Sequence, residues 1–380
     1  MNILICIDAF KGSLSSMEAG NACAAGIRRV FPDAAITIRP LADGGEGTTE
    51  SLVSGLHGEY RTVTVSDPLG RPIPVQYGIL PDGTAVIEMA AASGLPLLAE
   101  SERSPMKTTT FGFGEMIRDA IKAGCRNFIL GIGGSATNDG GIGCLQALGF
   151  DFLDADGKQV PFGAEGAAQI AAISENEVMP ELRDCTFHVA CDVKNPLCGE
   201  SGCSAVFAPQ KGADAVMIAQ MDAALSEFAR LTKSYHPEAD ADFPGAGAAG
   251  GLGFGLMSYL NASLEPGVEL ILQETSIEGA VKAADYVITG EGCLDAQTAM
   301  GKAPIGIARL AKFYGKPVIA FSGAVRAGAE QCHQAGIDAY FPILRRIESL
   351  EDAMQPDHAA RNLADAAEQA FRLLQCVLHI

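Results

Sequence analysis

The feature that most constrains this chain is a glycine-rich stretch, GIGGSATNDGG, at residues 131–141. It follows a short apolar run at residues 127–130 and precedes a helix-compatible apolar run at residues 142–148. A strand, a glycine-rich turn and a helix in this order direct free backbone N–H groups and a helix dipole toward an anion. Small residues also let a phosphate approach the backbone closely. The stretch therefore predicts the phosphate or nucleotide end of an active site, with tight backbone packing as the alternative.

Six residues of this stretch are candidates for nucleotide contact, because they combine small size with hydroxyl, amide and carboxylate groups. They are Gly133, Gly134, Ser135, Thr137, Asn138 and Asp139. The spacing Gly131-x-Gly133-x-x-Ala136 also fits the loose dinucleotide fingerprint, with acids at residues 151 and 154 following about 20 residues later. An NAD-dependent hydroxy-acid dehydrogenase is therefore the alternative function, although it leaves the acidic residues at other strand ends unexplained.

Composition sets limits on the class of protein. The chain has 380 residues, 48% of them hydrophobic, which is enough for two domains with a large core. Its net charge of −19 argues against nucleic acid and anionic membranes as partners, but not against a small anionic substrate. The 11 cysteines show no C-x-x-C spacing, and no apolar span is long enough to cross a membrane. We therefore expect a cytoplasmic protein with reduced cysteines and no zinc.

Periodicity divides the chain into two domains. Short apolar runs alternate with helical patterns in residues 1–60 and again in residues 285–380, as in a parallel α/β sheet. From residue 60 to residue 89 the pattern changes to alternating strands separated by turns, which predicts a β-meander. We therefore expect the two chain ends to form one domain, with residues 61–284 inserted as a second one.

Acidic side chains follow several of the predicted buried strands. Asp8, Asp192 and Glu291 stand at such positions, and Asp43 follows another strand by a few residues. Carboxylates beside glycine loops suit Mg²⁺-nucleotide chemistry, because Mg²⁺ takes one or two carboxylates together with phosphate oxygens and water. Four lysines are candidates for neutralising phosphate charge: Lys11, Lys194, Lys211 and Lys302. None lies in a P-loop, and the protein-kinase signatures are absent, so the pattern excludes both of these architectures.

Seven short motifs then occur in order along nearly the whole chain. They are DGGEGT (43–48), EMAAASG (88–94), the stretch 131–141, ACDV (190–193), PQKGA (209–213), PGAGAAGG (244–251) and TGEG (289–292). Together they resemble the bacterial glycerate kinase family (type 1). The resemblance implies a flavodoxin-like or Rossmann-like parallel-sheet domain from residues 1–60 plus 285–380, and a mixed α/β domain at residues 61–284. It also implies an active site in the cleft between these domains.

The resemblance further implies phosphorylation of D-glycerate that depends on ATP and Mg²⁺. The product would be 2-phosphoglycerate, as in many members, or 3-phosphoglycerate, in the breakdown of small organic acids. The resemblance implies D-glycerate as the small-molecule partner. It leaves open whether the protein forms a homodimer.

Site roles are hypotheses from residue type and predicted strand position. Asp192, Lys11 and Glu291 are assigned to catalysis, and Asp192 and Asp295 to Mg²⁺, while the stretch 131–141 holds the ATP phosphates. The residues assigned to substrate binding are Ser13, Asp43, Gly44, Gly45, Glu46, Lys211 and Lys302.

Overall fold

The computed structural model describes residues 1–378, which form two compact units. Unit 1 comprises Met1–Asp43, Glu50–His57 and the chain from Val268 onward, and unit 2 comprises Gly44–Thr49 and Gly58–Gly267. The fold is α/β with a parallel sheet and a mixed sheet, as predicted. Among the described residues, no helix combines the length and the apolar character that a membrane span requires.

Unit 1 is built on a five-stranded sheet in the order β13-β12-β11-β1-β2, and each neighbouring pair is parallel. Its strands are β1 (Asn2–Ile7), β2 (Ala35–Ile38), β11 (Tyr286–Leu294), β12 (Val318–Val325) and β13 (Ala339–Pro342). This is the strand order of flavodoxin-like folds, in which the order reverses between the first and third strands. Here those strands are β1 and β11, which come from opposite ends of the chain.

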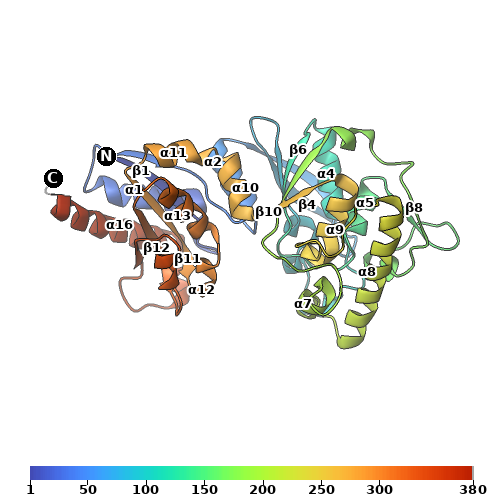
Figure 1. Ribbon diagram of the computed structural model, residues 1–380. Coiled ribbons are helices and arrows are strands. Elements are labelled where there is room, and N and C mark those ends of the chain that lie inside the picture. Colours follow the sequence, from blue (N-terminus) through green and yellow to red (C-terminus); the bar gives the residue numbers. More distant parts are fainter. Residues whose placement is uncertain (379–380) are drawn as a thin grey trace. The chain divides into compact units, whose positions relative to one another are not determined.

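Helices cover both faces of this sheet, and this explains why β1 contains only apolar residues after Asn2. Ile3, Ile5 and Ile7 pack in one core with helices α1 and α16, whereas Leu4 and Cys6 pack in another with α11 and α13. Figure 1 shows α1 beside β1 and α13 on the sheet in the same unit. The helices that belong wholly or mainly to this unit are α1 (Ser16–Arg28), α2 (Thr48–Leu56), α10 (Gly267–Glu274), α11 (Ile277–Ala283), α12 (Ala296–Ala299), α13 (Ala303–Phe313), α14 (Gln331–Gln334), α15 (Leu350–Ala353) and α16 (Pro356–Leu378).

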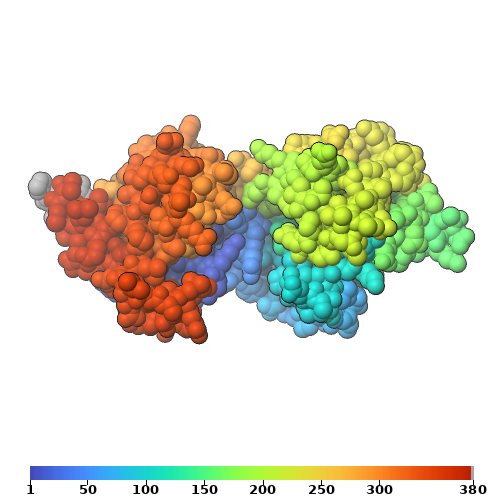
Figure 2. Space-filling model, turned by 90° about the horizontal axis from the view of Figure 1, so that it is seen from below, coloured from blue at the N-terminus to red at the C-terminus, as the bar shows by residue number. Residues whose placement is uncertain are grey.

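Both ends of the chain thus build unit 1. In Figure 2 the C-terminal residues, in orange and red, cover most of the visible face of this unit, with blue N-terminal residues beside them. Residues 268–284, which the sequence analysis assigned to the inserted domain, pack with unit 1 instead. Val268, Ile277 and Val281 share a buried core with residues of α13.

Unit 2 has a six-stranded mixed sheet in the order β10-β9-β6-β5-β4-β3 and a small antiparallel β7-β8 pair. The predicted meander is confirmed, because β3, β4 and β5 pair antiparallel in sequence order. From β5 to β10 the pairing is parallel, so the carboxyl ends of β5, β6, β9 and β10 meet at one edge. The strands are β3 (Glu59–Ser66), β4 (Pro72–Ile79), β5 (Ala85–Glu88), β6 (Asn127–Gly131), β7 (Asp151–Leu153), β8 (Ala172–Ser174), β9 (Thr186–Ala190) and β10 (Ser263–Glu265).

The helices of unit 2 enclose a large core that contains Phe113, Phe128, Phe152 and Phe228. They are α3 (Ala90–Ser93), α4 (Phe111–Lys122), α5 (Ile142–Ala147), α6 (Gly163–Ala167), α7 (Cys203–Phe207), α8 (Ala215–Tyr235) and α9 (Ala248–Leu260). Short 3-10 turns η1 (Leu95–Leu97), η2 (Glu100–Glu102), η3 (Pro180–Asp184) and η4 (Pro209–Lys211) join them.

Candidate active site

A cavity of about 430 Å³ lies in unit 1 at the carboxyl ends of its parallel strands. Its lining comes from the turn after β1, the ends of β11 and β12, and the segment that follows β13. Open α/β sheets bind ligands at this edge, beside the point where the strand order reverses. Six residues predicted from the sequence line the cavity: Lys11, Ser13, Asp43, Glu291, Asp295 and Lys302. The structure therefore brings together residues that lie almost 300 positions apart in the chain.

Asp8 is the carboxylate that burial affects most at this cavity. It directly follows β1, and its Oδ1 accepts a hydrogen bond from the N–H of Ala9 at 2.8 Å. Burial raises the pKa of Asp8 to about 7, and the nearby negative charges of Asp43 and Glu291 contribute to this increase. The Ala9 N–H and the charge of Lys11 act in the opposite direction. The cavity thus concentrates negative charge that a bound cation would stabilise.

Glu291 and Asp295 are both positioned by the start of α12. The hydroxyl of Thr298 donates to Oε1 of Glu291 at 2.6 Å, and burial raises the pKa of Glu291. Asp295 caps α12, because its Oδ1 accepts from the N–H groups of Gln297 and Thr298. Burial acts to raise the pKa of Asp295, but the Thr298 N–H and the charge of Lys302 outweigh it and hold that pKa below its usual range.

The turn after β1 presents Lys11 and Ser13 at the cavity. A pair of backbone hydrogen bonds between Phe10 and Leu14 closes the turn, and Gly12 supplies the positive φ of +78° that it needs. The side chain of Lys11 is exposed, whereas the Oγ of Ser13 is buried without a hydrogen-bond partner among the described residues. The strand-to-helix junction predicted here is therefore a preformed loop that faces the cavity.

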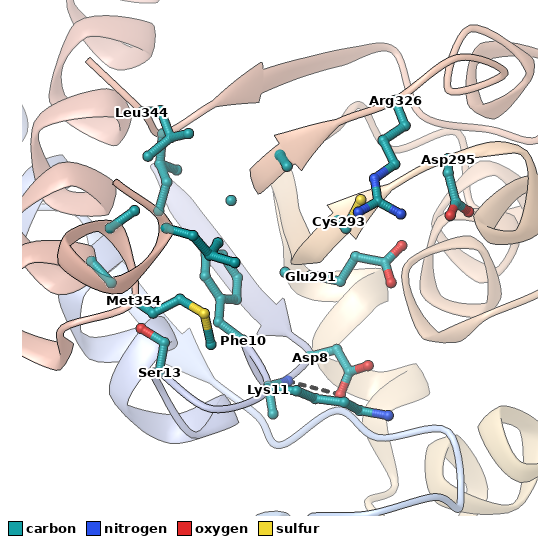
Figure 3. Close-up of a pocket in the computed structure, with 18 of the residues that line it drawn as sticks. Asp8, Phe10, Lys11, Ser13, Glu291, Cys293, Asp295, Arg326, Leu344 and Met354 are labelled. Atoms are coloured by element: carbon teal, nitrogen blue, oxygen red, sulfur yellow. Dashed lines mark hydrogen bonds between the residues drawn. The ribbon is translucent and has the colours of Figure 1, made fainter. Parts of the chain in front are cut away.

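The opposite side of the cavity is apolar, and no sequence motif pointed to it. Phe10, Leu344 and Met354 lie together there, away from Glu291 and Asp295, as Figure 3 shows. Leu344 and Met354 belong to the segment around α15, whose sequence carries no recognisable signature. Asp8 and Arg326 also line the cavity without having been assigned a role, although Asp8 was noted as a strand-end acid.

In unit 2, the glycine-rich stretch follows β6 as predicted, but most of it is buried. Gly133 and Gly134 are exposed, while residues 135–141 are buried. A side chain on Gly131 would meet the carbonyl oxygen of Gly44 at 2.8 Å, so the DGGEG motif lies directly against the stretch. The backbone of Gly133 and Gly134 is thus the part of the stretch that a ligand can reach.

Asp139 is held within the protein. Its carboxylate accepts hydrogen bonds from the N–H and hydroxyl of Thr110 at 2.8 and 2.9 Å. The N–H groups of Gly141 and Gly143 donate to the same carboxylate at 3.1 and 3.3 Å. Burial raises the pKa of Asp139 in spite of these four donors. The carboxylate of Asp139 is therefore buried and bound by groups of the protein itself, and the nucleotide contact expected from the sequence stays a prediction.

Lys211 is also directed inward. Its side chain is buried, and Nζ donates to the Oγ of Ser135 and to the carbonyl oxygen of Thr137, both at 2.7 Å. Burial lowers the pKa of Lys211 to about 8. Lys211, which the sequence analysis assigned to substrate binding, therefore anchors the glycine-rich stretch through Ser135 and Thr137 on its buried side. Asn138 is buried as well, and its Nδ2 donates to the Oγ of Ser204 at 2.9 Å.

The DGGEG motif lies at the carboxyl edge of the unit 2 sheet. Gly44 has a φ of +81°, and a Cβ there would come within 2.2 Å of the Cβ of Ala190, so no other residue fits. Gly45 is half-buried and Glu46 is exposed. Glu88, at the end of β5, accepts from the N–H groups of Gly47 and Thr49 at 3.3 and 2.7 Å. Its carboxylate thereby fixes the start of α2.

Asp192 follows β9 at the same edge. It is exposed, and its Oδ1 accepts from the N–H of Gly267 at 3.0 Å. The predicted site residues therefore form two groups, one with Lys11 and Glu291 in unit 1 and one with Asp192 in unit 2. Within residues 1–378, no cluster of three or more His, Cys, Asp or Glu side chains is arranged to hold a metal ion by itself.

The glycine run at residues 244–253 supports backbone packing, an option that the sequence left open. Ala249, Gly250 and Gly251 all have positive φ at the start of α9. The carbonyl oxygen of Gly250 accepts from the N–H of Gly140 at 3.0 Å, and a Cβ on Gly250 would come within 2.1 Å of the oxygen of Thr137. The run therefore packs against the buried part of the glycine-rich stretch.

Comparison with known proteins places this architecture in one family. The sequence pattern of the glycerate kinase family matches residues 3–375. The chain is 46% identical to a glycerate kinase of Haemophilus influenzae over the full length of both proteins. It is 44% identical to the glycerate 2-kinase of Escherichia coli, covering 96% of this chain and 97% of that protein.

A solved structure agrees. A crystal structure described as glycerate kinase 2 from Salmonella typhimurium LT2 superposes with a TM-score of 0.93 at 43% identity, and the match covers 100% of both chains. The comparisons give no support to the dehydrogenase alternative. On these matches, the chain belongs to the glycerate kinase family and is a kinase.

Proposed function

We propose that this kinase transfers the terminal phosphoryl group of ATP to the 2-hydroxyl of D-glycerate, giving 2-phosphoglycerate. The observation that carries the proposal is the unit 1 cavity, where acids and lysines meet at the reversal point of a parallel sheet. One similar protein, from Escherichia coli, carries the designation glycerate 2-kinase, which supports the 2-hydroxyl over the 3-hydroxyl.

The acidic residues of the cavity fit a magnesium ion held together with a nucleotide. Asp8, Asp43 and Glu291 repel one another electrostatically, and Asp295 adds a carboxylate close by. Mg²⁺ is held through one or two carboxylates plus phosphate oxygens, so a closed protein cage is not required. We assign Asp295 as the metal-binding candidate of this cavity, and Asp192 keeps the metal-binding role predicted from the sequence. When bound, Mg²⁺ would neutralise charge on the phosphates.

The remaining residues have roles in binding and proton transfer. Lys11 and Lys302 bind anionic groups, because both side chains line the cavity. Glu291 accepts the proton of the attacking hydroxyl, since burial raises its pKa and thereby its basicity. Gly133 and Gly134 are the exposed residues of the glycine-rich stretch, and we assign phosphate binding to their backbone. The buried residues Ser135, Thr137, Asn138, Asp139 and Lys211 position these two glycines.

The test uses purified protein with ATP, Mg²⁺ and D-glycerate, and identifies the product by phosphorus NMR. We expect 2-phosphoglycerate and ADP in equal amounts, with no turnover when a chelator removes Mg²⁺. A 3-phosphoglycerate signal would contradict the position of transfer. Nicotinamide reduction without ADP release would contradict the reaction class.

Variants test the residue roles. Lys11→Met should lower kcat/KM by at least about a hundredfold, because a charge-assisted contact to the substrates is lost. The matched control is Lys233→Met, at an exposed lysine on α8 of unit 2 that has no predicted site role. Asp192→Asn with a wild-type kcat and KM would remove Asp192 from the proposed mechanism.

We also propose that the enzyme acts in the cytoplasm. All 11 cysteines are free, which suits a reducing compartment.

A further inference from the structure

The apolar half of the unit 1 cavity has no use in binding glycerate. Glycerate carries a carboxylate and two hydroxyl groups on three carbons, so nearly all of its surface is polar. The cavity nevertheless places Phe10, Leu344, Leu350 and Met354 along one side. Its volume of about 430 Å³ falls in the range of sites for larger organic ligands, roughly 300–1,000 Å³.

The apolar side is also unusually exposed. Leu344 and Leu350 are 42% and 76% exposed, and Ile347 between them is fully exposed. Large aliphatic side chains gathered beside a cavity indicate a surface that a ligand covers, because exposing them to water is unfavourable. Asp8, Glu291 and Arg326 carry charged groups elsewhere in the cavity, and Figure 3 shows Glu291 and Arg326 apart from Leu344 and Met354.

We propose that the adenine base of the nucleotide binds in the apolar half of this cavity, between Phe10, Leu344, Leu350 and Met354. This inference rests on the proposed function, because it assigns the nucleotide of that reaction to a subsite. A nucleotide has an apolar planar base at one end and phosphates at the other, which matches the division of the cavity. The phosphates then lie toward Lys11 and Lys302, and the nearby carboxylates are compensated by the accompanying cation.

Two structural details strengthen this assignment. The Cε of Met354 lies 2.8 Å from the position that a Cβ on Gly12 would take, so the turn after β1 and the α15 segment form one continuous wall. The buried Oγ of Ser13, which has no partner among the described residues, is part of the same lining. Its hydroxyl is a polar group at the edge of an otherwise apolar wall.

The chain contains no tryptophan, so one introduced tryptophan reports on one position. In Leu344→Trp, ADP with Mg²⁺ should change the emission in a saturable way, because the base stacks on the indole. Magnesium tripolyphosphate and D-glycerate should leave it unchanged, since neither has a base. The control is Leu373→Trp, an exposed position on α16 away from the cavity lining, which should respond to none of these. A response of Leu344→Trp to D-glycerate but not to ADP would overturn the proposal.

A second variant measures the same subsite by kinetics. Leu350→Gln removes apolar contact from a mostly exposed side chain, so the fold should be unaffected. We expect the KM for ATP to rise by about threefold to tenfold and the KM for D-glycerate to stay unchanged. Leu373→Gln is the matched control. A rise in the KM for D-glycerate alone, or wild-type constants for both substrates, would contradict the proposal.

The two experiments separate this inference from the proposed function. If the wild-type protein fails to phosphorylate D-glycerate while Leu344→Trp still responds to ADP, the function is wrong and the nucleotide subsite stands. If D-glycerate is phosphorylated and Leu344→Trp does not respond to ADP, the subsite is wrong and the function stands.

Discussion

At the scale of single residues, Asp8 should make stability depend on pH. Its pKa of about 7 in the folded protein lies above the usual value of 3.8, so the folded state binds the proton more tightly than the unfolded state. Its contribution to stability is therefore present at acidic pH and is lost as the pH rises toward 7. This pKa shift corresponds to a change of at most about 4 kcal/mol in the free energy of unfolding.

Asp8→Asn removes this dependence. Without ligands, the variant should gain free energy of unfolding over the wild type as the pH rises from 5 to 8, as measured by urea denaturation. Asp82→Asn is the control, because Asp82 is exposed and likewise accepts a backbone N–H, from Thr84. A difference between Asp8→Asn and the wild type that is the same at both pH values would refute the assigned burial cost.

Lys211 gives a second prediction at this scale. Lys211→Met removes the donor to Ser135 and Thr137, at about 1–3 kcal/mol for each orphaned acceptor, but it also removes a buried charge. The two effects nearly cancel, so the melting temperature should change little. Activity should fall by at least about tenfold, because Gly133 and Gly134 lose their support.

Hydrogen exchange distinguishes this positioning role from substrate contact. In Lys211→Met, the backbone amides of residues 133–139 should exchange faster, whereas Lys233→Met, at an exposed lysine on α8, should leave them unchanged. Unchanged exchange together with a higher KM for D-glycerate would instead support the substrate-binding role expected from the sequence.

Residue type and strand position led to several residues that line the charged side of the cavity, and their roles stay predictions. Lys11, Glu291 and Asp295 were found because each follows a recognisable buried strand or lies just beyond one. The inward direction of Asp139 and Lys211 could not be predicted, since a motif names residues and not the atoms that their side chains meet. The apolar side was missed because Leu344 and Met354 reach it only through the path of the chain after β13.

At the scale of secondary-structure elements, the start of α9 depends on Gly250. Gly250→Ala combines an unfavourable φ of +69° with a clash against the oxygen of Thr137. We expect a loss of at least about 2 kcal/mol in the free energy of unfolding, together with lower activity. Gly279→Ala is the control, because Gly279 lies in α11 with nothing near its added Cβ, and it should change stability by less than about 1 kcal/mol. Equal melting temperatures for the two variants would contradict this packing role.

Elements with a strong hydrophobic period were predicted reliably, whereas the unit to which each element belongs was predicted less reliably. The apolar run of β1 and the alternation of β3 and β4 each reflect how many faces of a strand are covered. Helices α10 and α11 show a helical period, but a period does not say which core a helix joins. Their burial against α13 in unit 1 therefore became visible only in three dimensions.

At the scale of the whole molecule, the cysteines should differ sharply in reactivity. All 11 are free, and Cys376 on α16 is the one that is exposed, whereas the others are buried or half-buried. Burial raises the pKa of most of the others, for example that of Cys185 and Cys198 to about 11, which disfavours the reactive thiolate. A thiol reagent should therefore modify Cys376 first in the native protein.

Two measurements check this expectation. In the absence of reductant, a covalent dimer through Cys376 should appear on a non-reducing gel, and Cys376→Ser should abolish both the dimer and the fast phase of thiol modification. Persistence of the fast phase in Cys376→Ser would show that another cysteine is the most accessible.

The pairing of β1 with β11 has a consequence for how the chain folds during synthesis. Residues 3–7 pair with residues 286–290, so the central pair of the unit 1 sheet cannot form until nearly 300 residues have been made. At about 5–20 residues per second, β1 waits roughly 15 s to a minute for this partner, with only β2 available beside it. All strands of the unit 2 sheets are synthesised within that interval, because they lie between residues 59 and 265. We therefore expect unit 2 to fold first on the ribosome, while the apolar residues of β1 depend on chaperones or on transient contacts to stay out of aggregates.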